Sequence, residues 1–248
     1  MRIALLTTNL NETVEAQVKQ IDEYLSEFLS VDLLCLGNAY LMGETKLTGV
    51  YEDDLEIALN ADCKEILLLR EIAKKRRCGL GFGFVEKDDE GYIYNSYMLI
   101  DGLGNIVSIQ RSINDAWKPN DNEMYANGKG YNLVNYKGLT IAVASYGDLE
   151  HMDNILTLNS LNPDAVLWPI SLEFNPTEWR NEGLNELATQ LKIIKPHILL
   201  VNTYSDKEGL PSGGAYMFHE GHVMKELPLG NTGILIVSAA EIQDNNYN

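Results

Sequence analysis

Cysteine, basic residues and long apolar runs are all scarce in this chain. Its 248 residues include three cysteines, none in a CxxC pair, which argues against a disulfide framework or a structural zinc site. Lys and Arg number 19 against 36 Asp and Glu, giving a net charge of −17 that would repel nucleic acids and anionic membranes. No apolar run approaches the roughly 18 residues of a membrane span. We therefore expect no nucleic-acid partner, no membrane association and no bound metal.

Several catalytic and phosphate-binding motifs are also missing. There is no GxSxG nucleophile elbow, which weakens the interpretation of Ser145, Asp148 and His151 as a serine-hydrolase triad. The glycines of "GLGFG", residues 79–83, match neither GxGxxG nor GxxxxGK[ST]. They lie inside a strand pattern, which predicts a close approach of another backbone segment.

The chain has no long Pro/Gly/Ser linker, no internal repeat and no charge discontinuity. We therefore predict a single domain over residues 1–248. The apolar run in "MRIALLTTNL" is shorter than that of a signal peptide, so we expect a cytoplasmic protein.

Strand-like and helix-like segments alternate, with hairpins between some of them. Apolar residues at spacings of three and four predict a helix from Val14 onward. Further helices are expected over 65–77, 154–161 and 179–194, and strands over 2–7, 31–37, 78–86, 139–146, 164–171 and 197–205. Hairpins turn near Asp101-Gly102 and Glu220-Gly221, and a last strand follows from Thr232. Because both β-α units and hairpins occur, the fold class is α/β with a mixed sheet or pair of sheets.

Six of these segments, in order, resemble the nitrilase, or carbon–nitrogen hydrolase, superfamily. They are "DLLCLGNAYLMG", "GFVEKDDEGYIYNSYMLIDGLGNIV", "GLTIAVASYGDLEH", "PDAVLWPIS", "EWRNEGLNELATQLKIIKPHILLVNTYS" and "GGAYMFHEGHVMKELPLGNTGILIVSA". The resemblance covers nearly the whole chain. It implies a four-layer α-β-β-α sandwich of the nitrilase type and assembly as a homodimer. We expect no cofactor.

In the family, activity rests on a glutamate base, an oxyanion-stabilising lysine and a cysteine nucleophile. On this sequence those positions fall on Asn38, Ser112 and Tyr146. A phenol of pKa about 10 is a poor nucleophile at pH 7, an amide is no base, and a hydroxyl carries no positive charge. Further positions that the resemblance or the polar connections suggest for ligand binding are Arg111, Trp117, Asp121, Glu123 and Asp148.

Three hypotheses follow for function. The leading one is a catalytically degenerate nitrilase-fold protein, a pseudoenzyme that retains a pocket for a small amide- or carboxylate-like ligand or a partner. The alternative is an active amidase-like hydrolase that uses Tyr146, with Arg111 or Lys118 supplying positive charge within about 4 Å of its hydroxyl. The third is a structural or assembly role with the pocket closed.

Overall fold

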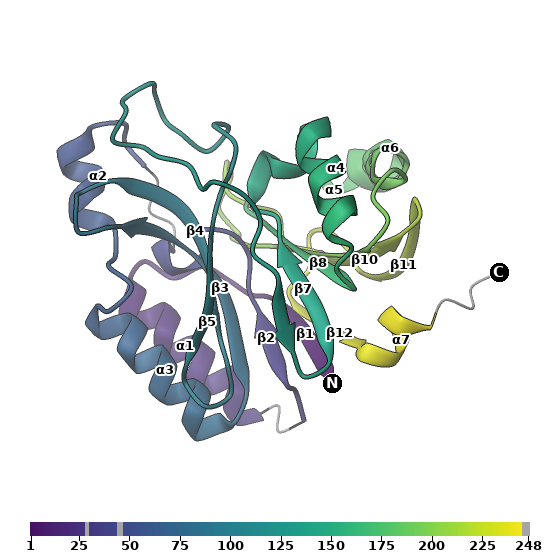
Figure 1. Cartoon of the computed structure of the whole chain (residues 1–248), viewed down its shortest axis with the longest axis horizontal. Helices are drawn as coiled ribbons and strands as arrows, with labels where there is room; N and C mark the ends of the chain where they lie inside the picture. Colours follow the sequence, from purple (N-terminus) through teal and green to yellow (C-terminus); the bar gives the residue numbers. More distant parts are fainter. Residues whose placement is uncertain (28–29, 44–46, 245–248) are drawn as a thin grey trace.

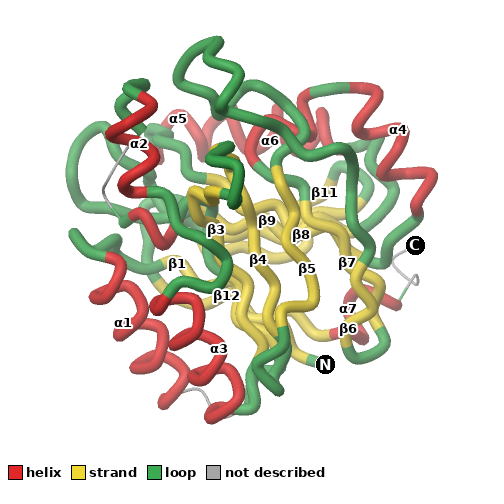
Figure 2. The backbone as a smooth tube through the Cα atoms, turned by 60° about the vertical axis from the view of Figure 1, so that its left-hand side comes forward, coloured by secondary structure: helices red, strands yellow, loops and turns green. Residues whose placement is uncertain are grey.

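Two six-stranded sheets pack face to face, and helices cover the outer face of each (Figure 1). The computed structural model describes residues 1–27, 30–43 and 47–244. Figure 2 shows α1 and α3 against one sheet and α4 and α6 on the opposite side of the molecule. The four-layer α-β-β-α sandwich predicted from the resemblance is confirmed.

The first sheet has the order β12-β1-β2-β3-β4-β5. Its strands are β12 Gly233–Ser238, β1 Arg2–Thr7, β2 Leu33–Cys35, β3 Gly79–Lys87, β4 Ile93–Ile100 and β5 Ile106–Arg111. The second sheet has the order β11-β10-β9-β8-β7-β6. Its strands are β11 His222–Leu227, β10 Ala215–His219, β9 His197–Asn202, β8 Ala165–Ile170, β7 Leu139–Val143 and β6 Val134–Tyr136.

Strand β1 shows how the layers form from an apolar run. Ile3 and Leu5 belong to the core between the two sheets, while Ala4 and Leu6 belong to the core under the helices. Successive side chains of a strand point to opposite faces, so a strand buried on both sides is apolar throughout. Each large aliphatic side chain buried in this way stabilises the fold by roughly 1.5–3 kcal/mol.

The helices over the first sheet are α1 Val14–Glu27 and α3 Lys64–Arg76. The predicted apolar stripe of α1 is confirmed, because Val18, Ile21 and Leu25 are all buried. Beyond α3, Arg77 adopts the left-handed conformation with φ 53°, so the helix ends at Arg76, and Gly79 begins the next strand.

The layer over the second sheet differs from the single helix expected over 179–194. It contains α4 Met152–Leu161, the short α5 Pro176–Glu178, a π-helical segment η3 Trp179–Gly183 and α6 Leu184–Leu191. Asn175 caps the start of α5 by accepting from the Thr177 N–H at 2.9 Å. The π-turn ends at Gly183, where a Cβ atom would lie only 3.2 Å from the Trp179 ring.

The turn after β7 begins earlier than the sequence predicts. The strand stops at Val143, and a 3-10 helix, η2 Tyr146–Glu150, follows. Ser145 and Asp148 form a capping box at its start. Residues 145 and 146 therefore belong to the turn, and they do not alternate across a sheet as the predicted strand over 139–146 requires. Elements that the sequence did not predict are η1 Tyr40–Met42, α2 Tyr51–Ile57, β6 and α7 Ala239–Gln243.

The close backbone approach predicted at the "GLGFG" glycines is confirmed at Gly83. A Cβ atom there would lie 2.3 Å from the Ala39 nitrogen and 2.7 Å from the Asn38 Cα. The segment after β2 therefore rests directly on β3, which fixes the position of Asn38. Within the described ranges, no helix is both long enough and apolar enough to cross a membrane.

Candidate functional site

A cavity of about 300 Å³ opens at the edge of the sandwich where the segments after β2 and β8 meet. Asn38 reaches it from the end of β2, Asn95 from β4 and Ser171 from the end of β8. The remaining wall residues are Leu10, Ala39, Met42, Gly43, Leu47, Val85, Ala116, Trp117, Glu173, Gly209, Leu210 and Pro211. Pockets at the carboxyl ends of strands are common binding sites in α/β proteins.

Two asparagines on the cavity wall are linked through one buried serine. The Asn95 side-chain amide donates to Ser145 Oγ at 3.3 Å, and Ser145 Oγ donates to Asn38 Oδ1 at 3.3 Å. Among the described residues, Asn38 Nδ2 and Asn95 Oδ1 have no hydrogen-bond partner in the protein. The wall thus presents one free amide donor and one free carbonyl acceptor.

Ser112 is not among the cavity-wall residues, and its hydroxyl is hydrogen-bonded to a buried carboxylate. Its Oγ donates to Asp148 Oδ1 at 3.2 Å, and the side-chain amide of Asn114 donates to both Ser112 Oγ and Asp148 Oδ1. Asp148 also accepts from the backbone N–H of Ile113 at 3.0 Å and of Ser145 at 2.8 Å. Burial raises the pKa of Asp148, and these hydrogen bonds oppose the increase. Asp148 therefore holds the segment after β5 against the start of η2.

Tyr146 occupies the first position of η2, immediately after Ser145. Its backbone therefore lies just after the end of β7, at the position where the resemblance places the family's nucleophile. The side chain of Tyr146 lies outside the described part of the structure.

Both cations of the alternative hypothesis are paired with carboxylates. Arg111 bonds to Glu86 through Nη2 at 2.6 Å and Nε at 3.0 Å, and its guanidinium lies 3.6 Å from the Tyr94 ring centroid. The hydrogen bonds that Arg111 donates to the Glu86 carboxylate raise the pKa of Arg111. Lys118 pairs with Asp115 at 2.6 Å. Neither Arg111 nor Lys118 is among the cavity-wall residues described above.

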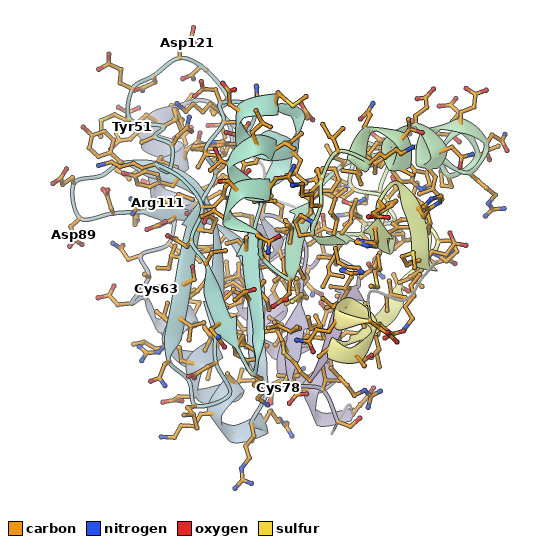
Figure 3. The ribbon with its side chains drawn as sticks, turned by 45° about the vertical axis from the view of Figure 1, so that its right-hand side comes forward. Tyr51, Cys63, Cys78, Asp89, Arg111 and Asp121 are labelled. Carbon is orange, nitrogen blue, oxygen red and sulfur yellow. The ribbon has the colours of Figure 1, made fainter. Side chains whose placement is uncertain are left out.

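The other predicted site residues fall into two groups. Trp117 is on the cavity wall. Asp121 and Glu123 are exposed and outside it, and Figure 3 shows Asp121 at the outer end of a long loop. His151 is also exposed, while Ser145 is buried and donates to Asn38, so these two do not form a hydrolase pair.

A buried aspartate supports two walls of the cavity. Asp54, on α2, has an exposed fraction of 0% and accepts from Thr48 N at 2.7 Å, Gly49 N at 3.0 Å and the Tyr125 hydroxyl at 2.6 Å. Burial alone would raise its pKa, but these bonds outweigh it and lower the pKa of Asp54. Tyr125 packs edge-on against Trp117, with ring centroids 6.2 Å apart. One carboxylate therefore ties together the segment that follows Leu47 and the loop that carries Trp117.

Three contributors to this site were not predicted from the sequence: Asp54, Ser145 as a bridge and Glu173. Asn95, by contrast, had a visible cue, since it is a polar residue inside the strongly apolar β4 pattern. Glu173 had none, because a single acidic residue in a loop is indistinguishable from the other acidic residues. The described residues contain no group of three or more His, Cys, Asp and Glu placed to hold a metal ion.

A family model described as carbon-nitrogen hydrolase matches residues 2–145. The chain belongs to the carbon–nitrogen hydrolase family. A curated relative of this hydrolase-family chain is the glutamine-dependent NAD(+) synthetase of Acinetobacter baylyi, 21% identical over 225 residues, or 89% of this chain and 40% of the relative. The chain thus spans about two fifths of that relative's length.

Solved structures at low identity share the fold of this family member. The glutamine-dependent NAD+ synthetase of Acinetobacter baumannii has a TM-score of 0.73 at 20% identity, covering 95% of this chain and 44% of that one. An amidase from Nesterenkonia sp. AN1 has a TM-score of 0.75 at 19% identity, covering 99% and 96%. A double mutant of that amidase was solved in complex with acrylamide. A CN-hydrolase superfamily protein from Xanthomonas campestris has a TM-score of 0.78 at 14% identity, covering 98% and 92%.

Proposed function

We propose that this chain is a catalytically degenerate carbon–nitrogen hydrolase that binds a small primary amide in the cavity around Asn38 and Asn95. The observation that carries the proposal is the neutral Asn95–Ser145–Asn38 chain on the cavity wall. Its free donor and free acceptor match the carbonyl and amino groups of a carboxamide. The acrylamide complex of the Nesterenkonia amidase supports this ligand class.

The charges around the site support the loss of hydrolysis. Attack on an amide requires a base and a group that stabilises the developing oxyanion. Asn38 offers an amide where the family has a carboxylate, and the Ser112 hydroxyl donates a hydrogen bond to Asp148. Arg111 and Lys118 are engaged by Glu86 and Asp115. The open cavity also favours ligand binding over a purely structural role.

Calorimetric titration with butanamide, alongside an ammonia-release assay, tests this function. We expect butanamide to bind without release of ammonia and butanoate to bind more weakly. Asn95→Leu keeps a branched side chain but removes the free carbonyl acceptor and the amide bond to Ser145. It should weaken butanamide binding about tenfold, which matches the net worth of one or two hydrogen bonds. Asn135→Leu, at an exposed position of β6, is the matched control and should leave binding unchanged.

Two results would overturn the proposal. One is steady ammonia release that Tyr146→Phe abolishes, which would establish the active amidase alternative. The other is the failure of butanamide and other small primary amides to bind the folded wild-type chain.

We further propose assembly as a homodimer through the face formed by α4 and α6. Large apolar side chains are exposed on this side of the molecule: Met152 at 55%, Leu156 at 58% and Ile193 at 47%. Burying such side chains against a second copy would remove them from water.

We retain a cytoplasmic location as a prediction. Subcellular fractionation tests the location, and recovery in a membrane pellet would contradict it.

A further inference from the structure

The cavity wall carries one kind of charge. Among its described residues Glu173 is the single ionisable side chain, and the wall has no described Lys, Arg or His. Glu173 lies in the loop after β8, and its Oε1 accepts from the Gly209 N–H at 3.3 Å. The bond from Gly209 orients the carboxylate, and a carboxylate has acceptor positions on both oxygens.

An aromatic side chain shares the wall with this carboxylate. Trp117 is half-buried, and its Nε1 donates to Asn127 Oδ1 at 3.0 Å. The indole also packs edge-on against Tyr125, with ring centroids 6.2 Å apart. A fixed indole ring and a carboxylate both attract an ammonium group, the first through its π-face and the second through its charge.

The same wall is unfavourable for an anionic ligand. A ligand carboxylate would enter a cavity whose described charge is negative and would find no cation on the described wall. The net charge of −17 adds a long-range repulsion of anions and attraction of cations.

We propose that the cavity selects amides that carry a cationic amine at the end remote from the amide group, with Glu173 and Trp117 as the residues that determine this specificity. The inference rests on the proposed function, since Asn38 and Asn95 hold the amide end. It assigns the ligand class as amino-amides without a free carboxylate. A cavity of about 300 Å³ is at the small end of ligand pockets, which suits a short linear molecule of this kind.

Three ligands of similar length separate the charges: 4-aminobutanamide is cationic, pentanamide is neutral and succinamate is anionic. Calorimetry at low ionic strength should give 4-aminobutanamide about a fivefold tighter Kd than pentanamide, with succinamate weakest. An exposed ion pair and a cation–π contact each contribute modestly, which sets this factor. Glu173→Gln should reduce the preference for the amine to about twofold. Glu182→Gln makes the same charge change at an exposed residue outside the cavity and should leave the preference at fivefold.

The outcomes separate this inference from the function on which it rests. Equal binding of 4-aminobutanamide and pentanamide, or a preference that survives Glu173→Gln, overturns the specificity alone. The absence of binding by all three ligands overturns both proposals. Trp117→Leu gives a second measurement, and retention of the full preference in that variant would show that the indole does not contribute to the specificity.

Discussion

Removing the Asp54 carboxylate should both destabilise the fold and weaken ligand binding. In Asp54→Ala, the Tyr125 hydroxyl loses its 2.6 Å acceptor, and the N–H groups of Thr48 and Gly49 lose theirs. Tyr125 is 1% exposed, so water cannot readily replace the lost acceptor. Thr48 is exposed, and its groups regain water after the substitution.

The magnitude follows from which groups stay buried. A buried donor without an acceptor costs about 1–3 kcal/mol, and a hydrogen bond to a charged acceptor contributes about 1.5–3 kcal/mol. Since the Tyr125 hydroxyl is the main group left without a partner, we expect the free energy of unfolding to fall by about 3 kcal/mol. Asp53→Ala changes an exposed neighbour on the same helix and should alter it by less than about 0.5 kcal/mol.

Urea unfolding of a double-mutant cycle isolates the bond itself. Asp54→Ala, Tyr125→Phe and the double variant should give a coupling of about 1.5–2 kcal/mol, because removing either partner already breaks the contact. Tyr125→Phe keeps the packing against Trp117, so it separates the hydrogen bond from the aromatic contact.

The same variant tests the link from Asp54 to the cavity. In Asp54→Ala, the butanamide Kd should rise even where calorimetry is done well below the unfolding transition, because two wall segments lose a shared anchor. A coupling near zero would refute the assigned bond. Destabilisation with an unchanged Kd would refute the claim that Asp54 positions the walls.

Two further predictions concern the second sheet and its outer face. His197, buried and stacked on His219 at 3.9 Å, has its pKa lowered to about 4, first by burial and then by repulsion from His219. Its unfolded pKa is near 6.5, so up to about 3 kcal/mol of stability, present above pH 6.5, should be lost as pH falls toward 4. Urea midpoints measured across this range should show the loss, and His197→Phe should reduce the pH dependence while the exposed His151→Gln does not. An unchanged pH dependence in His197→Phe would contradict the assignment. Light scattering should find a homodimer that Leu156→Glu converts to monomer and Leu103→Glu, at a 72% exposed hairpin position, does not; a monomeric wild type would contradict the dimer.

Much of the fold was predictable because its determinants are local. The run in β1 and the spacing of Val18, Ile21 and Leu25 in α1 specify strand and helix from neighbouring residues alone. Turn chemistry was equally local: Glu220 and Gly221 both have positive φ in the predicted hairpin turn. The extent of the helix after residue 179 was not predictable, since the π-turn depends on how Trp179 packs.

The candidate site was predictable only where a family pattern marked it. Asn38 was located from its position after a strand, and the structure puts it on the cavity wall. Asp121 and Glu123 looked equally suitable in the sequence, yet they are exposed and outside the cavity. Acidity is a property of the residue, whereas access to a cavity depends on the path of the loop.

The sequence by itself determined the alternation of elements and the family. Those properties reside in residue order and need no knowledge of contacts. Only the tertiary structure joined Asn95, Ser145 and Asn38 into one chain, although they are separated by 50 and 107 residues. Contacts of such sequence separation form because two sheets pack face to face, and the packing decides which polar groups are left free to meet a ligand.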